Sequence, residues 1–151
     1  MLSYIKTLHT VREKDSYTIS VNPLLNRIYV SFKQYLHNPG TAMEFDRDME
    51  IAFSEVISDC TIVVDRREAN WPLAKNDPFR FSLITKSLTY SIKALAEVVD
   101  ADQYIPDLLN NRLCFPFDPI FKKVTSLHAA ETWLNTLKIT PFKGELFHKE
   151  A

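Results

Sequence analysis

The sequence predicts an α/β fold: a single-domain mixed sheet in which an N-terminal antiparallel hairpin precedes parallel β-α crossovers, flanked by about four helices. Three observations predict it. Stretches 17–21 and 27–35 alternate apolar and polar residues, as half-buried strands do. Residues 60–65 are a short β-branched apolar run without alternation, which is typical of a central strand covered on both faces. Later stretches repeat apolar residues at helical spacing.

The hairpin and the first helix follow from turn and cap signals. Residues 22–26, which include a proline, connect the two alternating stretches. After the break at 38–40, Thr41 to Glu44 matches the capping box, in which a Thr hydroxyl and a Glu carboxylate satisfy free backbone donors. The pattern therefore predicts a helix that begins at Thr41 and ends near Ser58.

The second half of the chain continues the alternation of helices and strands. Pro78 opens a second amphipathic helix. Residues 94–99 fit both the end of that helix and a short buried strand, and the predictions on either side favour the strand. Residues 102–111 look helical, 121–124 fit an edge strand, and 126–137 form the last predicted helix. We expect the domain to span residues 17–138, with an extension over 1–16 and a tail over 139–151.

Composition narrows the function classes. The chain has 151 residues, of which 46% are hydrophobic and 25% charged, and its formal net charge is -1. This balance gives no reason to expect nucleic acid or an anionic membrane as partner. The two glycines, Gly40 and Gly144, stand alone, which excludes Gly-rich phosphate-binding loops. No apolar stretch approaches the roughly 18 residues that span a bilayer.

Cysteine and histidine usage indicates a cytoplasmic protein without metal or cofactor. Cys60 and Cys114 lie far apart behind an N-terminus that lacks a secretory signal, so we expect two reduced, inert thiols. The four histidines are scattered and show no metal-ligand spacing. Serine-nucleophile motifs and clustered carboxylates are missing from the sequence, so we expect no enzymatic activity.

The candidate binding residues follow the central strand. Asp65 ends that strand, where open parallel sheets present ligands. Two guanidiniums, an indole and an amine come next, a set that suits a carboxylate or phosphate and an aromatic ring. They are Arg66, Arg67, Trp71 and Lys75. Alternatively, Trp71 closes the end of the sheet while the charges stay in solvent. In both cases, replacing the two arginines by Ala is expected to change stability by at most roughly 0.5 kcal/mol.

The element order and three segments resemble the SpoIIAA-like branch of the STAS superfamily. The segments are IVVD at 62–65, KALAEVVDADQYI at 93–105 and FKKVTSLHAAETWL at 121–134. Ala130, Trp133 and Leu134 match the Ala-x-x-Trp-Leu ending typical of that branch. The resemblance implies a SpoIIAA-like fold over roughly residues 17 to 138.

The resemblance also implies a regulatory role, with one departure. STAS proteins of the anti-sigma antagonist type carry a phosphorylatable serine in a D-S-S-G setting after the third strand. This chain lacks that motif: Arg66 follows Asp65, and the first later serine, Ser82, lies inside the predicted second helix. We therefore list Ser82 only as an interaction candidate.

Three functions from different classes remain open on the sequence. The first is a non-catalytic regulatory or adaptor module that works through protein–protein contacts, as a homodimer or with a partner, in bacterial signalling or stress physiology. The second is a carrier or sensor of a small hydrophobic or anionic ligand, bound between the sheet edge and the second helix. The third is an enzyme that uses Asp65 or Cys60 with residues distant in sequence.

Overall fold

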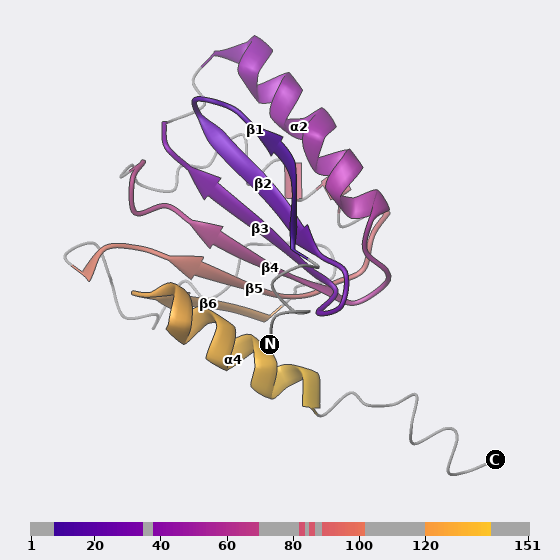
Figure 1. Cartoon of the computed structure of the whole chain (residues 1–151), viewed down its shortest axis with the longest axis vertical. Helices are drawn as coiled ribbons and strands as arrows, with labels where there is room; N and C mark the ends of the chain where they lie inside the picture. The colour runs from indigo at the N-terminus through magenta and orange to yellow at the C-terminus, as the bar shows by residue number, and fades with distance from the viewer. Residues whose placement is uncertain are drawn as a thin grey trace.

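The computed structural model describes residues 8–34, 38–69, 82–83, 85–86, 89–101 and 120–139. Its centre is a six-stranded mixed sheet in the order β1-β2-β3-β4-β5-β6 (Figure 1). β1, β2 and β3 pair antiparallel, and β3 to β6 run parallel. The strands are β1 (His9–Glu13), β2 (Tyr17–Asn22), β3 (Arg27–Phe32), β4 (Cys60–Asp65), β5 (Ile92–Val98) and β6 (Ile120–Val124). The predicted mixed sheet, with a hairpin before parallel strands and β4 in the interior, is confirmed.

Two helices cover opposite faces of this sheet (Figure 1). α2 (Pro39–Ser54) connects β3 to β4, and α4 (Leu127–Ile139) follows β6. The element order of the described residues contains these two helices, fewer than the about four expected. Of the predicted helix after Pro78, residues 82–83 and 85–86 are described and helical, whereas residues 102–111 lie outside the described part.

The apolar faces of the strands divide into two cores. The larger lies under α2 and contains Phe45, Met49 and Phe53 of the helix, packed on alternate residues of β2, β3 and β4. Burial there follows the alternation that the sequence displays, because successive strand side chains point to opposite faces. The smaller core packs Ala130 and Leu134 of α4 on β4, β5 and β6.

A buried charge fixes α4 to the sheet. Arg27 is fully buried, and its guanidinium donates hydrogen bonds to Thr61 Oγ1 at 2.9 Å and Asn135 Oδ1 at 3.0 Å. It also pairs with Glu131, which accepts a further hydrogen bond from the Tyr29 hydroxyl at 2.6 Å. A buried guanidinium requires such partners. The contacts therefore set the position of α4 on this face.

Two features near the N-terminus differ from what the sequence predicted. β1 was not predicted, because its residues are mostly exposed and carry a register shift between Thr10 and Arg12, which hides the alternation. The predicted capping box is wrong: Asn38 is the N-cap, and its side chain accepts hydrogen bonds from Gly40 N at 2.7 Å and Thr41 N at 3.4 Å. Pro39 then occupies the first turn, where its missing N–H costs nothing.

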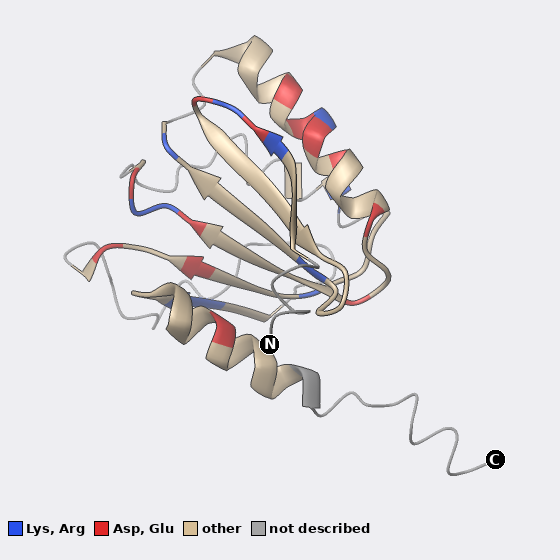
Figure 2. Cartoon of the chain, viewed as in Figure 1, with Lys and Arg blue, Asp and Glu red and all other residues tan. Residues whose placement is uncertain are grey.

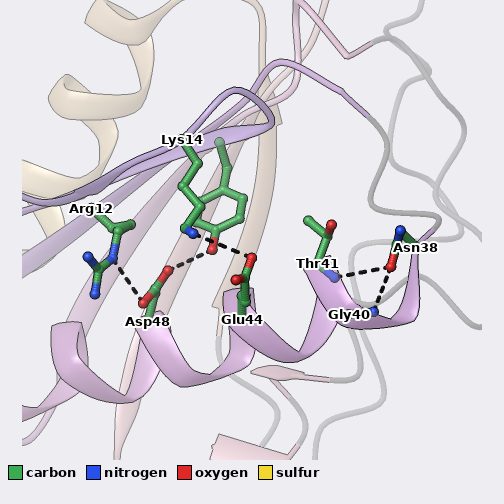
Figure 3. Close-up of polar contacts among 8 residues, drawn as sticks. Arg12, Lys14, Asn38, Gly40, Thr41, Glu44 and Asp48 are labelled. Carbon is green, nitrogen blue, oxygen red and sulfur yellow. Dashed lines mark hydrogen bonds and ion pairs between the residues drawn. The ribbon is translucent and has the colours of Figure 1, made fainter.

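Residues around β1 are tied to α2 by polar contacts (Figure 3). Arg12 donates to Asp48 at 3.2 Å, and Lys14 contacts Glu44, the residue expected in the capping box, at 3.4 Å. The buried Tyr17 hydroxyl donates to Asp48 at 2.6 Å. Burial first, and then Asp48, raises the pKa of Tyr17 above its ordinary value. Residues 9–16, placed in an extension by the sequence, thus pack on the body of the domain.

Candidate functional site

The first part of the predicted site lies at the carboxyl end of β4. Asp65 accepts hydrogen bonds from the Arg67 backbone N at 3.0 Å, from Nε at 3.0 Å and from Nη2 at 2.8 Å. These contacts with Asp65 raise the pKa of Arg67. Figure 2 shows acidic residues at the ends of β4 and β5 and basic residues in the loop after β4. The two-point contact is the strong form of such a pair. Each residue thus already has an opposite charge as partner.

Arg66 lies in a different environment. Its backbone N donates to Val98 O at 2.9 Å, so the pairing of β4 with β5 continues one residue beyond the strand. Its side chain is 4% exposed, pairs with the equally buried Glu97, and lies over the Phe32 ring at 5.5 Å. The expectation that Arg66 is solvated is therefore wrong, and its role in ligand binding stays a prediction. The alternation of side-chain direction along β4 continues through Arg66 and places its side chain in the core.

Ser82 packs against α2 rather than beside Asp65. Its hydroxyl donates to Asp46 Oδ1 at 2.8 Å, and Lys86 Nζ approaches the same oxygen at 2.9 Å and Glu50 at 3.3 Å. Burial acts to raise the pKa of Asp46, but the hydrogen bonds from Lys86 and Ser82 outweigh it and lower that pKa. Ser82 is itself 1% exposed, and its hydrogen bond to Asp46 connects the segment that carries Ser82 and Lys86 to α2.

The predicted residues therefore do not form one cluster. Asp65 and Arg67 are in contact, Arg66 is buried beneath the α2 side, and Ser82 is bonded to α2. Trp71 and Lys75 lie outside the described residues. A groove of about 170 Å³ beside Asp65 is lined by hydroxyl side chains of β2 and β3 and by Leu127 of α4. It is smaller than the roughly 300 Å³ at which ligand pockets begin.

The opposite, amino-terminal end of the parallel strands holds a structure that sequence analysis missed. Asn26, at the end of the β2–β3 turn, has a φ of 54°. Its Oδ1 accepts from Ile57 N at 2.8 Å, and its Nδ2 donates to Ser58 O at 3.0 Å. Its carbonyl accepts from Thr61 N at 3.0 Å. We call this set of three hydrogen bonds the Asn26 clasp, since it joins turn 23–26 to loop 55–59 and to the start of β4.

The clasp presents two large apolar side chains to solvent. Leu24, in the turn, is 66% exposed, and Ile57, in the loop, is 78% exposed. Single exposed apolar residues are common on protein surfaces, but these two are carried by adjoining segments that the clasp holds together. The Asn-Pro-Leu-Leu-Asn turn was visible in the sequence. Its pairing with residues 57 and 58 was not, because it depends on a contact across 31 residues.

A cavity of about 360 Å³ opens next to the clasp. Its floor includes Phe53 and Cys60, both 1% exposed, and its wall includes Tyr90, whose ring stacks on Phe53 at 4.7 Å and 13°. The Tyr90 hydroxyl donates to Glu50 at 2.9 Å. Burial raises the pKa of Cys60 to about 12, which keeps the thiol protonated at neutral pH. This protonation agrees with the inert thiol expected from the sequence.

Comparison of this chain with protein-family models, with curated proteins and with solved structures gives no match. Within the described ranges, no helix is long and apolar enough to cross a membrane. The same residues contain no group of three or more His, Cys, Asp or Glu side chains placed to hold a metal ion. A function must therefore be inferred from the geometry at the carboxyl and amino ends of the parallel strands.

Proposed function

We propose that this chain is a non-catalytic regulatory or adaptor module that acts through protein–protein contacts, with a second copy of itself as the first partner. The observation that carries the proposal is the pair Leu24 and Ile57, exposed by 66% and 78% on two segments joined by the Asn26 clasp. Exposed apolar side chains on adjoining segments can contribute to an interaction site.

The clasp makes this surface suitable for binding because it is ordered before a partner arrives. Association costs free energy for each loop and side chain that must be immobilised, and a surface that is already held avoids part of that cost. A standard interface buries about 800 Å² on each partner, which exceeds two side chains. Leu24 and Ile57 would therefore form the centre of the contact, where the energetically dominant residues of interfaces cluster.

The resemblance to the STAS superfamily supports the same function class. The order of a hairpin, a central IVVD strand and a last strand followed by the Trp133 helix is the order on which the resemblance rested. The buried free thiol of Cys60 agrees with a reducing, cytoplasmic location. The anionic-ligand alternative has less support, since Arg66 and Arg67 already face Glu97 and Asp65.

Native mass spectrometry and sedimentation velocity of the full chain test the proposal. We expect a dimer at micromolar concentration, and a shift to monomer in the double variant Leu24→Ser/Ile57→Ser. Met43→Ser is the matched control, because Met43 is 63% exposed but lies near the start of α2, away from the clasp. A monomeric unmodified chain would contradict self-association, and a dimer that the double variant leaves intact would exclude this surface.

A further inference from the structure

We infer that the cavity beside Cys60 binds a small, uncharged aromatic molecule that carries a polar group at one end. The cavity lies where the end of α2, the start of β4 and residues 89–91 meet. Its volume of about 360 Å³ falls within the range of ligand sites. Ile57 belongs both to the cavity lining and to the proposed contact surface, so ligand binding is tested separately from self-association, with a variant at Leu24, which lies outside the lining.

The lining selects against charged ligands. None of the described residues that line the cavity is charged. An anion or a cation placed there would lose its hydration without gaining an opposite charge, which is costly even in a partly buried site. Two carboxylates bonded to lining residues are already engaged: Asp59 accepts from the Ser91 hydroxyl at 2.7 Å, and Glu50 contacts Tyr90 and Lys86. The site therefore suits a neutral molecule.

The distribution of groups in the lining sets the orientation of such a molecule. Phe53 and Cys60 form a buried apolar floor, whereas Ser58, Thr89 and Ser91 are exposed residues with hydroxyls at the rim. A ligand pocket typically combines an apolar surface with a few polar groups that fix orientation. The ring of the ligand would enter towards the floor, and its polar group would stay at the rim.

The aromatic pair in the wall favours a ring over a flexible chain. Phe53 and Tyr90 stack at 4.7 Å with 13° between their planes, so the two rings lie nearly parallel, one over the other. Tyr90 is held in place by its hydrogen bond to Glu50. Rings add favourable stacked or edge contacts to such a pair beyond the burial of their area. A rigid ring also loses less conformational entropy on binding than an alkyl chain of equal size.

Benzamide and benzoate provide a matched pair of probes, because they have the same shape and differ in charge at neutral pH. We expect a two-dimensional amide NMR titration to show shifts at the Cys60, Thr89 and Ser91 amides with benzamide. The expected Kd is on the order of 1 mM for a probe of this size. Benzoate should bind at least tenfold more weakly. Equal binding of the two probes, or shifts located elsewhere, would overturn the inference.

Two variants make the test specific to the cavity. Ser58→Trp places a large side chain at the rim and should weaken benzamide binding at least tenfold, whereas Met43→Trp on α2 should leave it unchanged. Leu24→Ser keeps every lining residue, so benzamide binding in that variant should persist whatever its effect on oligomeric state. Unchanged binding in a folded Ser58→Trp chain would overturn the inference. A failure of self-association alone would not affect it.

Discussion

The two ends of the parallel strands differ in how their polar groups are used. At the carboxyl end, the charged residues predicted as binding candidates are paired within the fold. Asp65 pairs with Arg67, and Arg66 pairs with Glu97. At the amino end, backbone-directed hydrogen bonds of Asn26 hold two loops, leaving Leu24 and Ile57 exposed beside an uncharged cavity. A run of charged residues after a strand can therefore complete the fold, whereas the surface proposed for binding lies where Asn26 holds two loops together.

Replacing Arg66, at the carboxyl end, should have the largest effect on stability. In Arg66→Ala, the Glu97 side chain, which is 4% exposed in the native structure, loses its guanidinium partner. Removing one partner of a buried pair costs about 3–5 kcal/mol. We expect the free energy of unfolding, measured by urea denaturation at pH 7, to fall by that amount.

Arg67→Ala is the matched control for this prediction, one residue further along the chain. The Arg67 side chain is 37% exposed, and exposed pairs contribute at most about 1 kcal/mol. We expect its unfolding free energy to change within that limit. Similar losses in the two variants would show that burial does not distinguish the arginines, and a small loss in Arg66→Ala would restore it as a candidate for ligand binding.

The contrast between these arginines also shows what the sequence could predict. Strand β4 was predictable, because its unbroken β-branched run has one common explanation in an α/β chain. The environment of Arg66 was not, because it depends on the register of β4 with β5, which places Val98 O opposite its backbone N. Sequence patterns indicate which residues form strands, but the neighbour of each side chain is set by pairing between distant segments.

The amino end was harder to predict for a related reason. Asn26 was assigned to a turn, as its residue type favours. Its role in the clasp requires residues 57 and 58, which the helix α2 brings back to the start of β4. Likewise, Cys60 was interpreted as the inert start of a buried strand, which agrees with its burial. The cavity above it appears only when residues 89–91 are placed beside the end of α2.

Asn26 substitutions test whether the clasp orders the amino end. In Asn26→Ala, a residue that disfavours a φ of 54° replaces one that tolerates it, and two side-chain hydrogen bonds are lost. We expect a loss of about 1–2 kcal/mol in unfolding free energy. Asn26→Gly restores backbone tolerance without the side-chain bonds, so about half of that loss should remain. Changes under 0.5 kcal/mol in both variants would mean that the clasp contributes little.

Lowering the pH should weaken the contact of Ser82 and Lys86 with α2 and leave the Asn26 clasp unaffected. The expected loss of stability is smaller than in the substitutions above. The segment that carries Ser82 and Lys86 is bound to α2 through Asp46, whose pKa lies below its ordinary value of 3.8 because hydrogen bonds from Lys86 and Ser82 outweigh its burial. A carboxyl group with a lowered pKa in the folded state stabilises the protein above its unfolded pKa, and this contribution disappears as the pH falls through the folded pKa. Asp46→Asn should therefore be less stable than the unmodified chain at pH 7, by less than about 1 kcal/mol because the Asp46 side chain is 45% exposed. The difference should shrink towards zero near pH 3 in urea denaturation. The effect of Asn26→Ala, which involves no titrating group, should stay the same at both pH values. A pH-independent difference for Asp46→Asn would mean that its charge does not hold this segment.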